Sequence, residues 1–564
     1  MSLMRFLLIA FLIVVFAACA KAPETVSEEQ TSMPPNILLI VADDLGYSDI
    51  GPFGGEISTP VLDRLASEGL RFSGFHVLPT CSPTRSALLS GNDNHVAGMG
   101  VMAEFIYPEI EGLPGYVGHL ADQVAIIPEI LRQAGYHTYM AGKWHLGEED
   151  AQSPYARGFE QTFTMMQGGG SHWADMRPLS PSQEMIYRRN GERVSELPED
   201  FYSSKDYTDA LIEFIETDKG DGQPFFGYLS YTAPHDPLHA PAEYIERYRG
   251  KYEAGWDELA RQRLAALQEL GLVPESVEEF PANFMTKEWD SLSTEERQKF
   301  ARDMEVYAAM VEYLDMSIGR LFEYLETSGL YDKTLIVFFS DNGANGAPAT
   351  AYPGNADGSY LATFDNELEN RGLPNSFVDM GPSWAQASSA PFRLFKSFTS
   401  QGGIKAPMIA KVPRAMPTEG QWNHAFLHVT DILPTFLELA GATYPEVLDG
   451  RAIKPPTGKS MMPILSGAAE TIRQDEGVGY ELFEMKAYIR DKWKILRLPE
   501  PFGDGAWCLY DLSKDPGEMH DLSEEYPEIK AELSEAWQQY AEANEVFDHK
   551  GRFDAMYRKA YGAN

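Results

Sequence analysis

Four apolar, β-branched runs in the chain each end abruptly in polar residues. They are NILLIVADDLG (36–46), YHTYMAGKWHLG (136–147), PFFGYLSYTAPHDP (224–237) and TLIVFFSDNG (334–343). Runs that are apolar throughout, rather than at alternate positions, are typical of strands buried on both faces. Segments with helical periodicity precede two of them, at 126–135 and 307–329. This alternation predicts an α/β fold in which a large mixed, mainly parallel sheet lies between layers of helices.

The polar residues that close these runs are the first candidates for a functional site. In open parallel sheets, ligands bind beyond the carboxyl ends of the strands, so four strands with polar ends predict one shared crevice. Asp and Asn are also common turn residues after a strand, so one such end alone carries little weight. The candidates are Asp43 and Asp44, Lys143 and His145, His235 and Asp236, and Asp341 and Asn342.

The long stretch 344–403 has no clear periodicity and is rich in Asn, Gly, Ser, Pro and aromatic residues. A loop of this length directly after a strand end is usually functional or mobile. We expect it to form the rim of the pocket.

The pattern changes again after about residue 445. Residues 479–498 and 506–516 indicate short antiparallel strands, and 528–547 indicates a helix. We therefore expect a large domain over 36–445 and a smaller α+β domain over 446–564.

Composition narrows the classes of function. The chain has 564 residues, of which 44% are hydrophobic, and this is ordinary for a globular protein of more than one domain. Asp and Glu total 84 against 46 for Lys and Arg, a formal net charge of −38. Such a charge disfavours nucleic acid as a partner, and a site for an anionic substrate must carry its own local positive charge.

The N-terminus resembles a targeting segment. Arg5 precedes the apolar stretch 6–18, which at 13 residues is shorter than the about 20 that a membrane-spanning helix needs. FAAC resembles the bacterial lipoprotein box, which would make Cys19 a lipidated N-terminus, whereas Ala18-Cys19-Ala20 also fits ordinary signal cleavage. We favour the lipoprotein, so residues 1–20 are expected to be a signal peptide and 21–35 a polar linker. Both alternatives place the protein outside the cytoplasm, in the periplasm or anchored to the outer membrane of a bacterium.

The chain has three cysteines, at positions 19, 81 and 508, which form no framework of disulfides. A single bridge between Cys81 and Cys508 is a less favoured alternative, because Cys508 lies in an apolar strand and is expected in the core. Cys81 is different, since it stands in the polar turn CSPTRSALLSG (81–91) beside an apparent helix start. That setting suggests a reactive position rather than a packing one.

Several motifs in a fixed order connect Cys81 to a known family. C-x-P-x-R begins 38 residues after Asp43, and AGKWHLG, APHDP, SDNG and KSFTSQGGIKAP follow. Together they resemble the type I sulfatases over roughly residues 34 to 545. GNDNHVAGMGVMAE and YARGFE are most similar to the bacterial arylsulfatases of that family. The resemblance implies the alkaline-phosphatase-like fold and hydrolysis of sulfate esters, most closely aryl sulfates.

By this resemblance Cys81 is oxidised to Cα-formylglycine by a formylglycine-generating enzyme, with Pro83 and Arg85 in the recognition signal. The chemical need is clear, because a thiolate that attacked a sulfate ester would leave a stable S-sulfo adduct. The hydrated aldehyde is a geminal diol, in which one hydroxyl attacks sulfur and the other expels sulfate as the aldehyde re-forms.

The resemblance also implies one Ca²⁺ ion, held by oxygen donors and the modified Cys81 side chain. Its ligands would be Asp43, Asp44, Asp341 and Asn342, which suit a cation that accepts six to eight oxygens. Zinc phosphatases with a related sheet have a His directly after the corresponding Asp, and SDNG lacks it.

The family further implies roles for cations and histidines. Lys143, Arg85 and Lys396 resemble its sulfate-binding cations, with Lys405 as the competing choice for Lys396. His235 would be the general acid for the leaving oxygen, His145 would hold the diol, and Asp341 is the candidate base. His239 is a weaker candidate acid, and His95 and His172 are candidate substrate contacts.

Two other functions stay open at this stage. A phosphonate or phosphate monoester hydrolase would use the same formylglycine site. A non-catalytic surface lipoprotein that binds sulfated glycans would keep the fold but lose its ligands or nucleophile, and every motif position is present here.

Overall fold

The computed structural model describes residues 33–413 and 420–552, and from Pro34 onward the chain forms one compact unit. The expected signal peptide with Cys19 lies outside the described residues. Disulfide bonding is absent from the described part of the chain, where Cys81 and Cys508 are both free thiols. Cys508 is half-buried and packs against the core.

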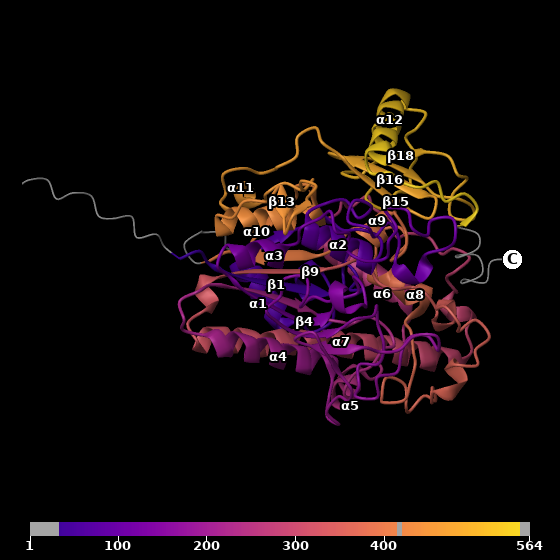
Figure 1. The fold of residues 1–564 in the computed structure, drawn as a ribbon. Coiled ribbons are helices and arrows are strands. Elements are labelled where there is room, and N and C mark those ends of the chain that lie inside the picture. The colour runs from indigo at the N-terminus through magenta and orange to yellow at the C-terminus, as the bar shows by residue number, and fades with distance from the viewer. Residues whose placement is uncertain (1–32, 414–419, 553–564) are drawn as a thin grey trace, which may run out of the picture. The chain divides into compact units, whose positions relative to one another are not determined.

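The four predicted runs are strands, and they lie next to one another at the centre of a ten-stranded sheet (Figure 1). They are β1 (Asn36–Ala42), β4 (His137–Lys143), β8 (Phe225–Ser230) and β9 (Thr334–Ser340). Their order is β9-β1-β8-β4, and all three pairings are parallel. These parallel central strands confirm the expected fold class. Strands this apolar are stable only where both faces of the sheet are covered.

Shorter strands complete the sheet on both sides, and the sequence pattern did not reveal them. Beyond β9 lie β10 (Met408–Lys411), β2 (Leu70–Phe72) and β11 (Gln421–Asn423), and β10 pairs antiparallel with both neighbours. Beyond β4 lie β5 (Gln161–Met165), β6 (Tyr187–Arg189) and β7 (Glu192–Val194). Strand β6 pairs antiparallel with both β5 and β7. These antiparallel margins make the sheet mixed, as expected.

Helices cover both faces of this sheet (Figure 1). One layer holds α1 (Pro60–Glu68), α4 (Ser203–Asp218) and α7 (Thr294–Thr327), and α7 contacts each of the other two. The other holds α2 (Cys81–Ser90), α3 (Ile127–Gln133) and α10 (Ile432–Ala440). Helix α7 begins thirteen residues before the expected 307, because Ser293 and Glu296 form a capping box at its start.

A separate four-stranded antiparallel sheet follows near the C-terminus, as the pattern after residue 445 predicted. Its strands are β15 (Val478–Leu482), β16 (Met485–Arg490), β17 (Trp493–Arg497) and β18 (Cys508–Asp511). Helix α12 (Pro527–Ala543) packs on this sheet. The domain boundary at 445/446 stays a prediction, since the described residues on both sides of it belong to the same compact unit.

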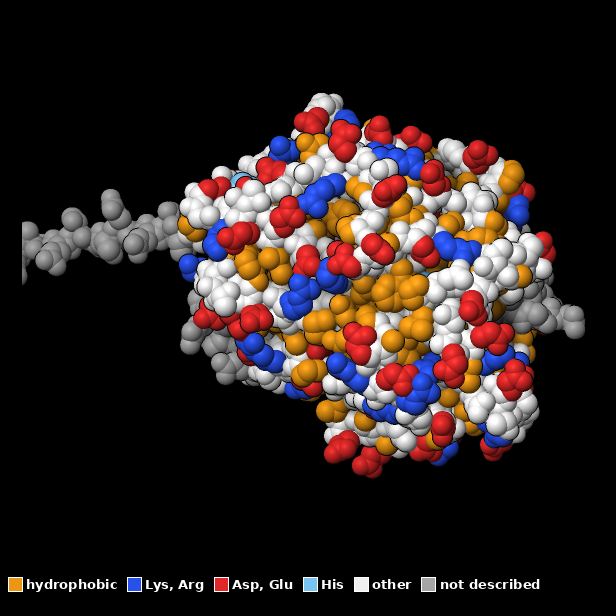
Figure 2. Space-filling model, turned by 90° about the horizontal axis from the view of Figure 1, so that it is seen from below, with side chains coloured by type: hydrophobic (Ala, Val, Ile, Leu, Met, Phe, Trp, Pro, Cys, Tyr) orange, Lys and Arg blue, Asp and Glu red, His pale blue; other side chains and the backbone are white. Residues whose placement is uncertain are grey.

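The remaining elements are short, apart from α6. They are β3 (Phe75–His76), β12 (Leu427–His428), β13 (Val447–Leu448), β14 (Arg451–Ala452), α5 (Ala242–Ile245), α6 (Trp256–Glu269), α8 (Gly381–Ser388), α9 (Gln401–Ile404) and α11 (Met462–Leu465). Within the described ranges, no helix has the length and apolar character needed to cross a bilayer. Figure 2 shows the side that lies at the bottom of Figure 1, where acidic and basic side chains are interspersed around a hydrophobic area.

Candidate active site

The register of the central strands brings the candidate residues to one edge of the sheet. Ala42 at the end of β1 pairs with Ser340 at the end of β9, so Asp43 and Asp341 emerge side by side. The backbone N–H of Asp44 donates to Oδ1 of Asp341 over 3.2 Å, and Asp44 has a left-handed φ of 66°. This turn aims the carboxylates of Asp43 and Asp44 into the same buried site.

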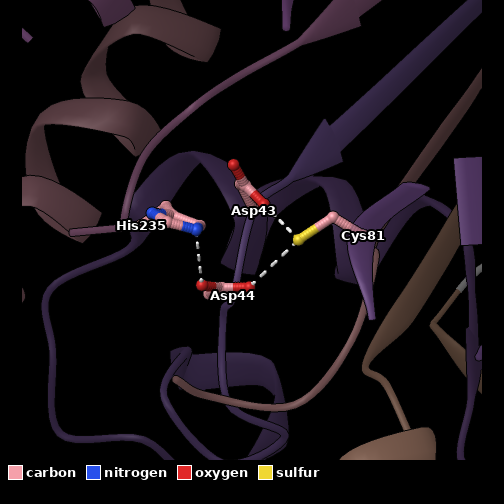
Figure 3. Close-up of side chains that lie close together, drawn as sticks. All are labelled: Asp43, Asp44, Cys81 and His235. Carbon is pink, nitrogen blue, oxygen red and sulfur yellow. Dashed lines mark hydrogen bonds and ion pairs between the residues drawn. The ribbon is translucent and has the colours of Figure 1, made fainter. Parts of the chain in front are cut away.

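Cys81 faces these carboxylates from the first residue of α2 (Figure 3). Its Sγ lies 3.4 Å from Oδ1 of Asp43 and 3.6 Å from Oδ1 of Asp44, and the residue is 1% exposed. Burial, and next the negative charge of Asp341, raise the pKa of the Cys81 thiol well above its ordinary value. The encoded side chain would therefore be a neutral thiol, which is a poor nucleophile.

Two buried lysines approach the paired aspartates. Nζ of Lys143 lies 2.9 and 2.7 Å from the two carboxylate oxygens of Asp43, and Nζ of Lys396 lies 2.8 Å from Asp44. Burial alone would raise the pKa of Asp43, but Lys143 and its other positive neighbours outweigh it and lower the pKa to about 2. Lys405, the competing choice, lies elsewhere, 4.6 Å from the ring centre of Phe392. The geometry thus brings Lys396, rather than Lys405, into the site.

Arg85 lies one helical turn after Cys81 and is completely buried. Its Nη2 is 2.7 Å from Oδ2 of Asp341, and Nη1 donates to the carbonyl of Lys143 over 3.2 Å and to the hydroxyl of Ser230. With its donors used inside the protein, Arg85 is placed to hold Asp341 and the end of β4. This arrangement favours a positioning role over the direct sulfate contact expected from the sequence.

The donors around Cys81 fit a hard divalent cation. Single ligand atoms of Asp43, Asp44, Cys81 and His235 all lie within 4.8 Å of one another. The side-chain amide of Asn342 donates to Asp44 over 2.6 Å, while its Oδ1 is buried and has no partner among the described residues. Carboxylate and amide oxygens are the ligands that Ca²⁺ prefers, so Asp43, Asp44, Asp341 and Asn342 would hold it.

His235 lies on the far side of Asp44 from Cys81 (Figure 3). Its Nε2 is 3.4 Å from Oδ2 of Asp44, and its Nδ1 is 2.6 Å from the backbone carbonyl of Asp236. The carboxylate of Asp236 in turn accepts from the hydroxyl of Tyr352 over 2.8 Å and from Asn345 over 2.6 Å. Both of these residues belong to the 344–403 loop, which therefore reaches the site as a rim would.

The other histidines have different surroundings. Nε2 of His145 is 2.9 Å from Oε1 of Glu104, a residue that the sequence analysis missed. His172 and His239 are buried and bonded to protein groups, so they lie near the site without a free ring edge. His95 is bonded to Asp93 and faces Glu481 of the C-terminal sheet, and we no longer expect it to contact substrate. Glu104 ends the family-like stretch GNDNHVAGMGVMAE, but nothing in that stretch pairs it with His145, and Tyr352 lies in no motif. Only the fold brings Glu104 to His145 and Tyr352 to Asp236.

Comparison with known proteins agrees with this geometry. The family model described as Sulfatase matches residues 35–442, and the model for the C-terminal part of N-sulphoglucosamine sulphohydrolase matches residues 392–543. An uncharacterized sulfatase of Schizosaccharomyces pombe is 44% identical over 525 residues, covering 91% of this chain and 94% of that protein. The arylsulfatase of Klebsiella aerogenes is 42% identical over 433 residues, covering 76% and 92%.

A solved structure supports the fold alone. Ps i-CgsB, in complex with k-i-k-neocarrahexaose, is 24% identical with a TM-score of 0.65, and the match covers 94% of this chain and 100% of that one. The family match extends over most of the chain and includes every motif around Cys81. The chain belongs to the sulfatase family and is a sulfuric ester hydrolase.

Proposed function

We propose that this sulfatase hydrolyses aryl sulfates and that its nucleophile is a formylglycine made from Cys81. The observation that carries the proposal is the position of Cys81 at the start of α2, beside two aspartates that are themselves paired with lysines. A neutral, buried thiol is unsuited to attack on sulfur, whereas a diol at the same place has two oxygens for the two steps. The aryl preference is supported by the 42% identity to a protein named arylsulfatase.

The two steps balance with this chain's own groups. One diol hydroxyl loses its proton to Asp341 and attacks sulfur, while the S–O bond to the phenol breaks and His235 protonates the leaving oxygen. The remaining hydroxyl then loses its proton to His145, the aldehyde re-forms, and the bond between carbon and the sulfate oxygen breaks to release sulfate. Addition of water to the aldehyde restores the diol.

The buried cations bind the sulfate group. Lys143 and Lys396 keep their charge, because the pKa of each is raised: burial opposes this, but the nearest aspartate outweighs it. Ca²⁺, when bound by Asp43, Asp44, Asp341 and Asn342, would supply Lewis acidity toward the sulfate and the diol.

Maturation and location form part of the proposal. Cys81 requires a formylglycine-generating enzyme, which acts before folding completes, since the folded chain leaves Cys81 only 1% exposed. We also propose that the chain is exported, with the apolar stretch 6–18 as its signal and Cys19 as a possible lipid anchor.

The test is to produce the chain with a formylglycine-generating enzyme and measure the peptide mass across residue 81. The expected result is conversion of Cys81 to formylglycine in proportion to activity on p-nitrophenyl sulfate. The Cys81→Ala protein should bind sulfate esters without hydrolysing them, and removal of calcium with a chelator should abolish turnover until calcium is returned. Full activity in a protein that retains the thiol, or after complete chelation, would contradict the mechanism.

The phosphonate or phosphate monoester hydrolase is tested with the same preparation. We expect p-nitrophenyl sulfate to be turned over with a higher kcat/KM than the phosphate and phosphonate analogues. A higher kcat/KM for either analogue would overturn the sulfate assignment while leaving the formylglycine chemistry in place.

A further inference from the structure

The surroundings of His145 fix the orientation of its imidazole ring and the ring nitrogen that carries the proton. It follows Lys143 at the end of β4, has a left-handed φ of 55°, and its backbone N–H donates to the carbonyl of Met166 over 3.1 Å. Nε2 of its ring lies 2.9 Å from Oε1 of Glu104. A carboxylate accepts hydrogen bonds, so the proton of the neutral ring is on Nε2.

The other ring nitrogen is left with a lone pair. Nδ1 of His145 is buried and has no hydrogen-bond partner in the part of the chain that the structure describes. The residue is 7% exposed, so this nitrogen is shielded from bulk water. Burial, which Glu104 only partly opposes, lowers the pKa of His145 and keeps the ring neutral.

Gly168 closes this arrangement from the end of β5. A methyl group at Gly168 would lie 2.6 Å from Cε1 of His145 and 3.1 Å from Oε1 of Glu104. Both distances are shorter than ordinary contacts, so a methyl group there would force the ring or the carboxylate to shift. The absence of a side chain at Gly168 therefore leaves the space in which the imidazole and the carboxylate meet.

We propose that Glu104, with Gly168 beneath it, is a positioning residue that fixes the tautomer of His145 for the release of sulfate. The inference rests on the proposed function, in which His145 accepts the proton of the remaining hydroxyl. With Nε2–H donated to Glu104, Nδ1 takes that proton, and the carboxylate stabilises the imidazolium that forms. The aldehyde re-forms as the bond to sulfate breaks, so the second step depends on Glu104 and the first does not.

Glu104→Gln tests this by separating the two steps. The variant keeps a side chain of the same size but loses the charge, so the first turnover should still release p-nitrophenol as a burst. The steady-state rate should fall about tenfold to a hundredfold, as for other partners of site residues. Intact mass measurement during turnover should show the sulfated enzyme accumulating.

Matched variants separate positioning from a loss of structure. Glu111→Gln removes an exposed carboxylate in the same loop, and Gly170→Ala places its methyl against Met185 instead of His145. Both should turn over without accumulating the sulfated enzyme, while Gly168→Ala should accumulate it as Glu104→Gln does. An unchanged rate in Glu104→Gln, or a slow rate with neither burst nor adduct, would overturn the inference.

A second measurement does not depend on activity. In protein labelled with nitrogen-15 at histidine, the signal assigned to His145 by comparison with His145→Asn should show a proton on Nε2 and none on Nδ1. A proton on Nδ1 would overturn the inference even in an active enzyme. If the wild-type chain hydrolyses no sulfate ester, the proposed function is contradicted instead. The nitrogen-15 signal of His145 still tests the assigned tautomer independently of activity.

Discussion

Two lysines of one motif, KSFTSQGGIKAP, have opposite surroundings in the folded chain. The ammonium of Lys396 lies 2.8 Å from Asp44, among the acids that surround Cys81. The ammonium of Lys405 lies over the rings of Tyr47 and Phe392, 5.4 and 4.6 Å from their centres. Burial lowers the pKa of Lys405 to about 8, whereas Asp44 overcomes the effect of burial on Lys396. Only Lys396 is placed to meet an anion bound at Cys81.

Substitution of each lysine by methionine should therefore have unequal effects. A unit charge about 4 Å from the sulfate, at an effective dielectric near 20, contributes about 4 kcal/mol, or roughly three decades in rate. We expect Lys396→Met to lower kcat/KM for p-nitrophenyl sulfate by about a thousandfold. Lys405→Met keeps the side-chain volume and should retain most of that activity. Equal losses of kcat/KM in the two variants, with equal thermal stability, would contradict the assignment of sulfate binding to Lys396 rather than Lys405.

The site residues that could be predicted from the sequence are those whose motifs the family shares. Asp43, Cys81 and Lys143 lie at strand ends or helix starts that the local pattern already marks. The partnership of Glu104 with His145 could not be predicted, although Glu104 ends the stretch GNDNHVAGMGVMAE, because no spacing in the sequence links the two residues. Tyr352 could not be predicted either, since it reaches Asp236 from a loop with no periodicity. The sulfate contact expected of Arg85 stays a prediction, and only the fold shows that Arg85 also bonds Asp341 and Ser230.

At the scale of elements, predictability follows burial on both faces. The four central strands are apolar throughout because helices cover them on each side, and this leaves a strong signal in the sequence. Strands β2, β10 and β11 have only three or four residues each, too few for a period to be recognised. The start of α7 was also missed, because its first six residues, 294–299, are all polar and the signal there is the capping box at Ser293.

The first turn of helix α1 is capped by a side chain of another helix, α7. No side chain at its own N-cap, Thr59, bonds the first turn. Instead Asp315 of α7 accepts from the backbone N–H groups of Val61 and Leu62 over 3.0 and 2.8 Å. The first turn of α1 thus depends on a carboxylate that lies more than 250 residues later and is 1% exposed.

Asp315→Ala should destabilise the fold without affecting chemistry. Each buried amide left without an acceptor costs about 1–3 kcal/mol, so the urea midpoint should fall clearly. Glu312→Ala, on the same helix but paired with the exposed Arg247, should change it little. The kcat on p-nitrophenyl sulfate should stay at the wild-type value in both, since neither residue is near Cys81. A midpoint unchanged by Asp315→Ala would show that water or backbone adjustment satisfies the turn.

At the scale of the whole molecule, a buried polar network joins the turn segment after α2 to the C-terminal sheet and to α12. Nδ1 of His95 lies 2.9 Å from Asp93, which also accepts from the hydroxyl of Tyr540 on α12 over 2.8 Å. Nε2 of His95 faces Glu481 of β15 over 3.5 Å. The turn segment after α2 is therefore connected to the C-terminal sheet by one imidazole between two carboxylates, as well as by apolar packing.

This network gives the stability of the whole chain a defined pH dependence. Burial would lower the pKa of His95, but Asp93 and Glu481 outweigh it and raise the pKa from 6.5 to about 9. Because the folded state holds this proton more tightly than the unfolded state, the stabilisation is complete below pH 6.5 and is lost as the pH rises through 9. The shift corresponds to about 3 kcal/mol.

Urea unfolding of the wild type should therefore show a midpoint that falls across this pH interval, and His95→Gln should remove that part of the fall. General repulsion from the net charge of −38 acts on both proteins and cancels in the difference between them. His520→Gln, at an exposed position, should follow the wild type. Parallel curves of urea midpoint against pH for the wild type and His95→Gln would show that the network carries no such proton.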